Sequence, residues 1–212
     1  MKKELILFDN DGVLVETEQW FYQANKEVLE SVGVSLPIEK YMKIMINGKS
    51  ALDLLYDRGF TSIEKEKVRQ KRITRYQEFL NEKDLKIPGV VETLEKLKPY
   101  FKMAIVTTCM PDDFDIIHQD DEITKFMDKI FTRRDYKKSK PHPEPYQTAL
   151  NSFGISPENA IVVEDSERGL RSAVAANIDC VIIKNQFTKS HNFSKAKTIL
   201  PNFPDMAEFL IK

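Results

Sequence analysis

Residues 5–13 read Leu-Ile-Leu-Phe-Asp-Asn-Asp-Gly-Val, a short apolar run that leads directly into two aspartates and a glycine. Such an apolar run is typical of a short buried strand. Asp9 and Asp11 are two positions apart, so at the end of a strand their side chains share a face. Two carboxylates that converge need a cation, or one of them must hold a proton. The pattern therefore indicates chemistry at a strand end.

Other short apolar runs recur along the chain and lack the alternation of a half-exposed strand. They lie at 102–107, 160–164 and 179–183, with a very short one at 130–131. Helical patterns separate most of them, at about 90–99, 112–120, 144–153 and 167–176. Alternating strands and helices predict an α/β fold whose core is a Rossmann-like, doubly wound parallel sheet.

The stretch between the first strand and Pro88 contains no convincing strand. Helical patterns fill it, at about 17–32, 37–46, 49–58 and 63–82, with glycine or proline at the turns. A connection of this length without its own structure would be unusual. We therefore expect an α-helical bundle cap domain of residues 15–86, inserted into a core made of residues 1–14 plus 87–212.

Composition is that of an ordinary globular protein, with 32 basic and 33 acidic residues and a net charge of −1. This balance gives no pull toward nucleic acid or an anionic membrane, so we expect neither as a partner. We expect no signal peptide, because the N-terminus runs directly into the first strand. Cys109 and Cys180 are the two cysteines, and reduced thiols in a cytoplasmic protein are the expected state. The oligomeric state is not readable, and a monomer fits the sequence.

Polar residues follow the predicted strands at the edge where open parallel sheets bind ligands. They are Asp9 and Asp11, the pair Thr107-Thr108, Lys140 in a proline-rich loop, and the pair Glu164-Asp165. Together these residue types suit phosphoryl transfer. Carboxylates are ligands for Mg²⁺, which offsets the charge of a phosphate, and a lysine can neutralise a further oxygen. A carboxylate can also attack phosphorus to form an aspartyl-phosphate.

The order and spacing of these motifs resemble the phosphatase branch of the haloacid dehalogenase superfamily. The matching segments are Asp-Asn-Asp-Gly-Val at 9–13, Ile-Val-Thr at 105–107, Lys-Pro-His-Pro-Glu at 140–144 and Val-Glu-Asp-Ser-Glu-Arg-Gly at 163–169. The resemblance covers the whole chain, including a helical cap inserted after the first strand. Any one motif alone would be weak, and each has a structural reading as a turn, a strand end or a helix cap.

The resemblance implies a role for each matching residue. Asp9 is the expected nucleophile and Asp11 the general acid and base. The expected phosphate-binding residues are Thr107, Thr108, Lys140 and Asn10. The expected ligands of a Mg²⁺ cofactor are Asp9, Asp165 and the backbone carbonyl of Asp11, with Glu164 either a ligand or a residue that orients the ligands.

Within the superfamily, the segment 13–18 and the cap look closest to the β-phosphoglucomutase-like group. Two polar anchors of the mutases are absent: Trp20-Phe21 stands where they have a histidine, and Ala51 where they have an arginine. Lys49 could replace the lost charge, so a sugar phosphomutase stays an alternative. Cap residues expected to set specificity are Thr17, Trp20, Phe21, Asn47, Lys49 and Ser50.

The expected function is Mg²⁺-dependent hydrolysis of a small soluble phosphate monoester, at a site between core and cap. Asp11 disfavours the dehalogenase and phosphonatase branches, which lack a second aspartate in this motif. A catalytically silent binding or regulatory protein with the same fold is the alternative from another class. The intact set of Asp9, Asp11, Lys140 and Asp165 argues against it.

Overall fold

Parallel strands form one sheet in the computed structural model, which describes residues 3–46 and 48–211. The strands are β1 (Leu5–Phe8), β2 (Lys102–Val106), β3 (Lys129–Phe131), β4 (Ala160–Glu164), β5 (Asp179–Ile183) and β6 (Thr198–Leu200). Their order across the sheet is β3-β2-β1-β4-β5-β6, and every neighbouring pair is parallel. The predicted doubly wound α/β fold is confirmed.

Strand β1 lies at the point where the strand order reverses. The chain runs outward from it through β2 to β3 on one side, and from β4 through β5 to β6 on the other. In register, Phe8 pairs with Ile105 of β2 and with Val163 of β4. Ligands of doubly wound sheets bind at such a switch point, outside the carboxyl ends of the strands. The residues that follow β1, β2 and β4 therefore lie where a ligand of this fold would bind.

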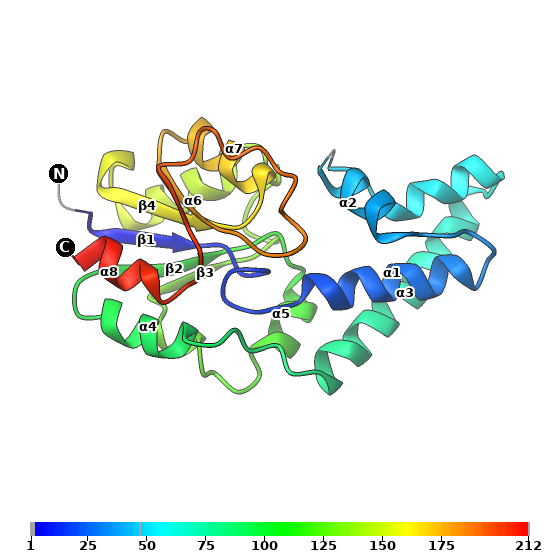
Figure 1. The fold of residues 1–212 in the computed structure, drawn as a ribbon, viewed down its shortest axis with the longest axis horizontal. Coiled ribbons are helices and arrows are strands. Elements are labelled where there is room, and N and C mark those ends of the chain that lie inside the picture. The colour runs from blue at the N-terminus through cyan, green and yellow to red at the C-terminus, as the bar shows by residue number, and fades with distance from the viewer. Residues whose placement is uncertain (1–2, 47, 212) are drawn as a thin grey trace. The chain divides into compact units, whose positions relative to one another are not determined.

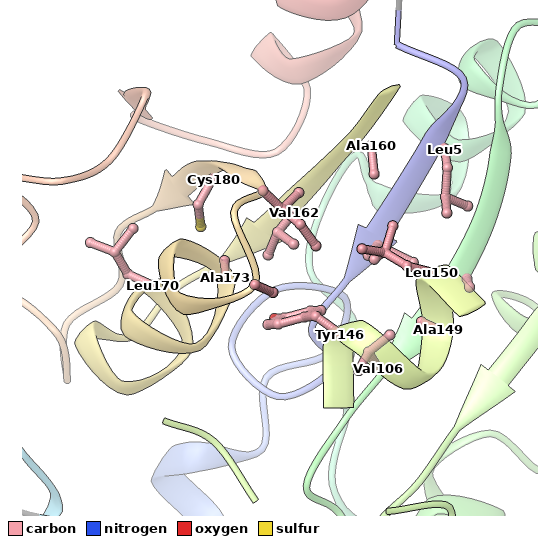
Figure 2. Packing of buried hydrophobic residues seen from close by; sticks show 14 of the residues in the cluster. Leu5, Val106, Tyr146, Ala149, Leu150, Ala160, Val162, Leu170, Ala173 and Cys180 are labelled. Carbon is pink, nitrogen blue, oxygen red and sulfur yellow. The ribbon is translucent and has the colours of Figure 1, made fainter. Parts of the chain in front are cut away.

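Helices cover both faces of the sheet (Figure 1). One face carries α6 (Glu144–Phe153) and α7 (Glu167–Ala175), and the other carries α4 (Val90–Leu97) and α8 (Asp205–Ile211). Helix α5 (Pro111–Ile117) follows β2, and short 3₁₀ turns, η2 (Thr124–Phe126) and η3 (Pro157–Asn159), precede β3 and β4. Figure 2 shows the core under α6 and α7, where Tyr146 and Leu150 pack with Val162 and Ala173.

The chain divides into two compact units, one of Met1–Glu16 with Lys86–Lys212 and the other of Thr17–Leu85. The sheet and its helices make up the first unit. The second contains α1 (Glu18–Glu30), α2 (Ile38–Ile46), the 3₁₀ helix η1 (Ala51–Arg58) and α3 (Ser62–Glu82). These bounds differ from the predicted ones by two residues at the first junction and by one at the second. That the helical unit acts as a cap stays a prediction.

The predicted helix at 49–58 is instead a 3₁₀ helix. Ser50 caps it, accepting a hydrogen bond from the Leu52 N–H, and Asp53 completes a capping box. Leu52 and Leu55 are both buried. Residues three apart eclipse each other on a 3₁₀ helix, so this winding places both leucines against the core of the unit.

The sequence patterns did not predict β6 and α8, the last two elements in the chain order. Both are short: β6 has three residues of mixed exposure, and α8 has seven. Periodicity cannot identify elements of this length, and their positions depend on contacts with the sheet. Phe203, just before α8, is 1% exposed and packs its ring 5.8 Å from that of Phe8.

A membrane-spanning helix is not found among the residues that the structure describes. Helix α3 has 21 residues, enough to cross a bilayer, but charged side chains run along it.

Replacing Phe203 with alanine should lower the free energy of unfolding by about 3–5 kcal/mol, because a buried aromatic ring against β1 is lost. Urea denaturation measures the change. Ile199→Ala is the control: Ile199 is 44% exposed on the edge strand β6, and its loss should cost no more than about 0.5 kcal/mol. Equal effects of the two substitutions would show that the C-terminal segment does not pack on β1 as described.

Candidate active site

The end of strand β1 carries the acidic pair into a tight loop. The Asp9 N–H still donates to the carbonyl of Val163 on β4, at 2.9 Å, so Asp9 extends the sheet pairing. The chain then turns: the carbonyl of Asn10 accepts hydrogen bonds from the N–H groups of the next residues, Val13, Leu14 and Val15. This turn holds Asp9 and Asp11 at the carboxyl edge of the sheet.

Lys140 is the centre of the site. Its Nζ donates three hydrogen bonds, to Asp9 Oδ1 at 2.7 Å, to Glu164 Oε1 at 2.7 Å and to the carbonyl of Val106 at 2.8 Å. Its side chain is 3% exposed, that of Glu164 is fully buried, and that of Asp9 is 13% exposed. One ammonium therefore joins the carboxyl ends of β1, β2 and β4.

Glu164 has both carboxylate oxygens occupied by protein donors. Besides Lys140, the Tyr146 hydroxyl donates to Oε1 at 2.9 Å. The Ser166 hydroxyl donates to Oε2 at 3.0 Å, with weaker backbone donors beside it. A Cβ on Gly169 would lie 1.8 Å from this carboxyl group, so only glycine fits there. This arrangement favours Glu164 as the residue that orients the site over Glu164 as a direct ligand.

Asp165 projects from the turn between β4 and α7 and is 7% exposed. The Asn185 side-chain amide donates to its Oδ2 at 2.7 Å. The side-chain oxygen of Asn185, Oδ1, accepts a hydrogen bond from the Phe187 N–H, which fixes the orientation of the Asn185 amide. Gly12 passes close by: a Cβ there would lie 2.4 Å from Asp165 Oδ2. Asp165 is thus held from two sides.

Thr107 follows β2 and is fully buried. Its hydroxyl donates to Asp11 Oδ2 at 3.2 Å and accepts from the Cys109 N–H at 3.0 Å. Thr108 is half-buried at the rim. The structure therefore brings the expected acid–base residue and the expected phosphate-binding threonine into contact.

Among the described residues, Asp9 and Glu164 share one ammonium, that of Lys140, and Asp11 and Asp165 lie at the same strand ends. Burial and the charge of Glu164 raise the pKa of Asp9 to about 7, with Lys140 opposing and Asp11 adding to the rise. Burial alone would lower the pKa of Lys140, but the carboxylates of Asp9 and Glu164 outweigh it and hold that pKa above its usual range. A further cation would relieve this excess of negative charge.

A metal ion fits this donor set. Asp9, Glu164 and Asp165 each offer a carboxylate oxygen within 4.8 Å of the other two. Since the oxygens of Glu164 are already hydrogen bonded, Asp9 and Asp165 are the better candidate ligands. Carboxylate oxygens in this number suit Mg²⁺, which completes its shell with water.

Asn10, an expected phosphate-binding residue, contacts a histidine. It is fully buried, and its Oδ1 is 2.8 Å from His118 Nε2. Burial lowers the pKa of His118 to about 4, against the charge of Asp11, so the imidazole is neutral at pH 7. The side chain of Asn10 therefore joins the loop to His118, and its part in phosphate binding stays a prediction.

The two cysteines form no disulfide. Burial and the charge of Asp11 raise the pKa of Cys109, so its thiol stays protonated at pH 7. Cys180 is buried in the core cluster (Figure 2).

The expected specificity residues of the helical unit have structural neighbours of their own. The Trp20 ring lies 5.6 Å from that of Phe79, and Phe21 meets Tyr76 edge to face. Thr17 is buried at the start of α1, Ser50 caps η1, Lys49 is exposed, and Asn47 lies outside the described residues. Their contact with substrate stays a prediction.

Several residues of the site were not singled out from the sequence. Asn185 follows β5 at the same sheet edge, so the strand-end rule that located the other motifs could have found it. Tyr146 and His118 gave no such signal: Tyr146 lies in α6 and His118 directly follows α5, and only the packing of those helices decides where the two side chains end. His191 Nδ1 accepts a hydrogen bond from the Glu167 N–H, at the start of the helix that follows β4.

Comparison with known proteins identifies the family. Residues 6–183 match the haloacid dehalogenase-like hydrolases, so the chain belongs to that family. The resemblance drawn from the motifs is confirmed.

Two sequence relatives and one solved structure illustrate which members of the family this chain resembles. The chain is 29% identical to the phosphorylated carbohydrates phosphatase of Thermotoga maritima, over 93% of this chain and 90% of that one. It is also 29% identical to the pyrophosphatase PpaX of Oceanobacillus iheyensis, over 86% and 84%. The crystal structure of CbbY from Rhodobacter sphaeroides in complex with phosphate matches the fold with a TM-score of 0.83, at 24% identity, over 96% of each chain. The names of the two sequence relatives agree with the predicted class of enzyme, a phosphatase of this hydrolase family, and the crystal structure shows the shared fold.

Gly12→Ala should weaken Mg²⁺ binding about 10-fold or more, because the added methyl group displaces Asp165 and Asn185. The rise in Tm with Mg²⁺ concentration measures the affinity without any substrate. Gly33→Ala is the matched control: Gly33 has φ +78° against +77° at Gly12, but open space around it. It should share the backbone strain and keep the Mg²⁺ response. The same Mg²⁺ response in both variants would contradict this assignment of the site.

Proposed function

We propose that this protein hydrolyses small-molecule phosphate monoesters in a Mg²⁺-dependent reaction, through an aspartyl-phosphate on Asp9. The observation that carries the proposal is the set of contacts around Lys140, which holds Asp9 beside Glu164 and Asp165. The positive charges of Lys140 and of a bound metal ion would offset the repulsion between the Asp9 carboxylate and a phosphate dianion, so that the carboxylate can attack.

In the first half of the reaction, an oxygen of Asp9 attacks phosphorus. The new bond joins Asp9 to phosphorus as the bond to the ester oxygen breaks, and the leaving oxygen takes a proton from Asp11. Lys140 and Thr107 are the proposed phosphate-binding residues: the ammonium of Lys140, whose three protons have protein acceptors, would offset the charge of the phosphoryl group, and the Thr107 hydroxyl would exchange its contact with Asp11 for a phosphoryl oxygen. Until then, the hydrogen bond from Thr107 keeps the Asp11 carboxyl at that edge of the site.

In the second half, water attacks the phosphorus of the aspartyl-phosphate. Asp11, now ionised, takes a proton from that water, and the acyl phosphate bond breaks to release phosphate and restore Asp9. Asp11 acts as acid in one half and base in the other, so its protonation state is restored after each turnover.

Mg²⁺ would be held by the carboxylates of Asp9 and Asp165 and by the Asp11 carbonyl. It supplies positive charge that offsets the oxygens of the transferring phosphoryl group. Asn185 and Gly12 fix the position of Asp165, and Lys140 fixes that of Asp9. These residues set the geometry of the site through protein contacts alone.

A phosphorylated carbohydrate or a related small metabolite is the proposed substrate class. The name of the relative from Thermotoga maritima supports it, as does the structure of a CbbY variant with xylulose-1,5-bisphosphate. The helical unit 17–85 is the proposed cap. A cytoplasmic localisation, expected from the two thiols, stays part of this proposal.

Phosphate release from a panel of esters with Mg²⁺ tests the function against its alternatives. Release of phosphate supports the phosphatase. Conversion of a sugar phosphate to its isomer without release would replace it by a mutase, and absence of turnover on every ester would replace it by a silent binding protein.

Asp9→Asn should lower kcat by on the order of 10³-fold or more, because the amide has the same shape but is barely nucleophilic. Circular dichroism and the thermal unfolding curve serve as the control for folding. A folded variant that retains substantial turnover would rule out the covalent scheme.

Asp11→Asn should slow turnover in proportion to the difficulty of the leaving group. An alkyl phosphate needs a proton on its leaving oxygen and should lose about 10²–10⁴-fold, whereas p-nitrophenyl phosphate should lose much less in the first step. Comparing kcat/KM for the two esters gives the test. An equal loss on both would mean that Asp11 does not protonate the leaving group.

A further inference from the structure

Arg168 is a cation at the edge of the site that the proposed reaction does not use. It is the second residue of helix α7, and its Nη2 lies 3.4 Å from the Thr108 hydroxyl, to which it donates a long hydrogen bond. Thr108 directly follows Thr107. Arg168 therefore reaches from the end of β4 to the end of β2, across the carboxyl edge of β1.

Among the described residues, Thr108 is the one hydrogen-bond partner of the Arg168 guanidinium. Within the described part of the chain, its guanidinium forms no ion pair, and its hydrogen bond goes to a neutral hydroxyl. Asp9 and Glu164 form their ion pairs with Lys140. Arg168 thus has donors available for an anion from solution.

The position of Arg168 also runs against local preference. A positive side chain in the first turn of a helix is disfavoured by the helix dipole, and acidic residues are favoured there. Its neighbour Glu167 follows that preference. A residue that breaks a local rule without a structural compensation is expected at a functional site.

Arg168 is more exposed to solvent than the residues that contact the proposed reacting groups. Thr107, which contacts Asp11, is fully buried, whereas Thr108 and Arg168 are half-buried at the rim. The transferring phosphoryl group would occupy the buried position beside Asp9, where Lys140 already provides a positive charge. A cation at the rim is placed to meet the leaving group.

We propose that Arg168 determines specificity by binding a second anionic group, carried on the leaving group of the substrate. The preferred substrates are then phosphate esters whose alcohol portion bears a carboxylate or a second phosphate. A guanidinium can bind either group through two parallel hydrogen bonds. This inference rests on the proposed phosphatase function.

Matched pairs of esters test the proposal. 3-Phosphoglycerate and glycerol 3-phosphate differ in a carboxylate, and glucose 1,6-bisphosphate and glucose 6-phosphate differ in a second phosphate. In Arg168→Gln, kcat/KM should fall about 10- to 100-fold for the doubly anionic member of at least one pair, and less than about 3-fold for its partner. The loss should appear mainly in KM, because the contact is remote from the bond that breaks. The pair that responds identifies the anion.

Two further variants serve as controls. Arg171→Gln removes the same charge from an exposed position on the same helix and should change neither member of a pair. Arg168→Lys keeps the charge without the planar fork and should recover part of the lost discrimination.

Equal losses on both members of a pair would overturn the proposal, because Arg168 would then act on the transferring phosphoryl group or on the Thr107-Thr108 turn. Unchanged kinetics in Arg168→Gln would overturn it too. In either case wild-type turnover leaves the proposed phosphatase function standing. Absence of turnover by the wild type on all four esters and on p-nitrophenyl phosphate would instead remove that function and this inference together.

Discussion

The contacts of Lys140 are the constraint on which the rest of the site depends. A buried ammonium is tolerated because two carboxylates and a backbone carbonyl take its three protons. Removing one partner of such a group leaves an uncompensated charge in the interior, which costs far more than a surface contact. The bridge also joins three neighbouring strands at their carboxyl ends. The position of the proposed nucleophile is thereby tied to the sheet itself.

The acidic cluster around Lys140 also depends on close packing of the backbone against its carboxylates. Gly169 lies against the carboxyl group of Glu164, and Gly12 against that of Asp165. A side chain at either position would push an acidic group away from the cluster. Acidic residues that repel one another stay together here because glycine allows the chain to approach and because each carboxylate has donors. The arrangement leaves an excess of negative charge that suits a divalent cation.

Glu164 and Asp165 are adjacent in sequence but have different environments. Glu164 points into the core under α6 and α7, where Tyr146, Lys140 and Ser166 take both of its oxygens. Asp165 lies beyond the strand end, held by Asn185. Alternation along a strand places neighbours on opposite sides, and here it separates an orienting residue from a candidate ligand. The buried charge of Glu164 needs its several hydrogen-bond partners, because burial penalises a charge that lacks them.

The sequence by itself determined the fold class and which strand ends carry polar residues, because both follow from local patterns: short apolar runs, helical periodicity, and acids or threonines directly after a strand. Only the tertiary structure decided which of those residues meet and which further ones join them. Tyr146 lies in a helix, His118 directly follows one, Arg168 reaches another strand end, and β6 and α8 are too short to show a pattern of their own. Contacts between segments distant in the chain depend on packing, and packing leaves no period in the sequence.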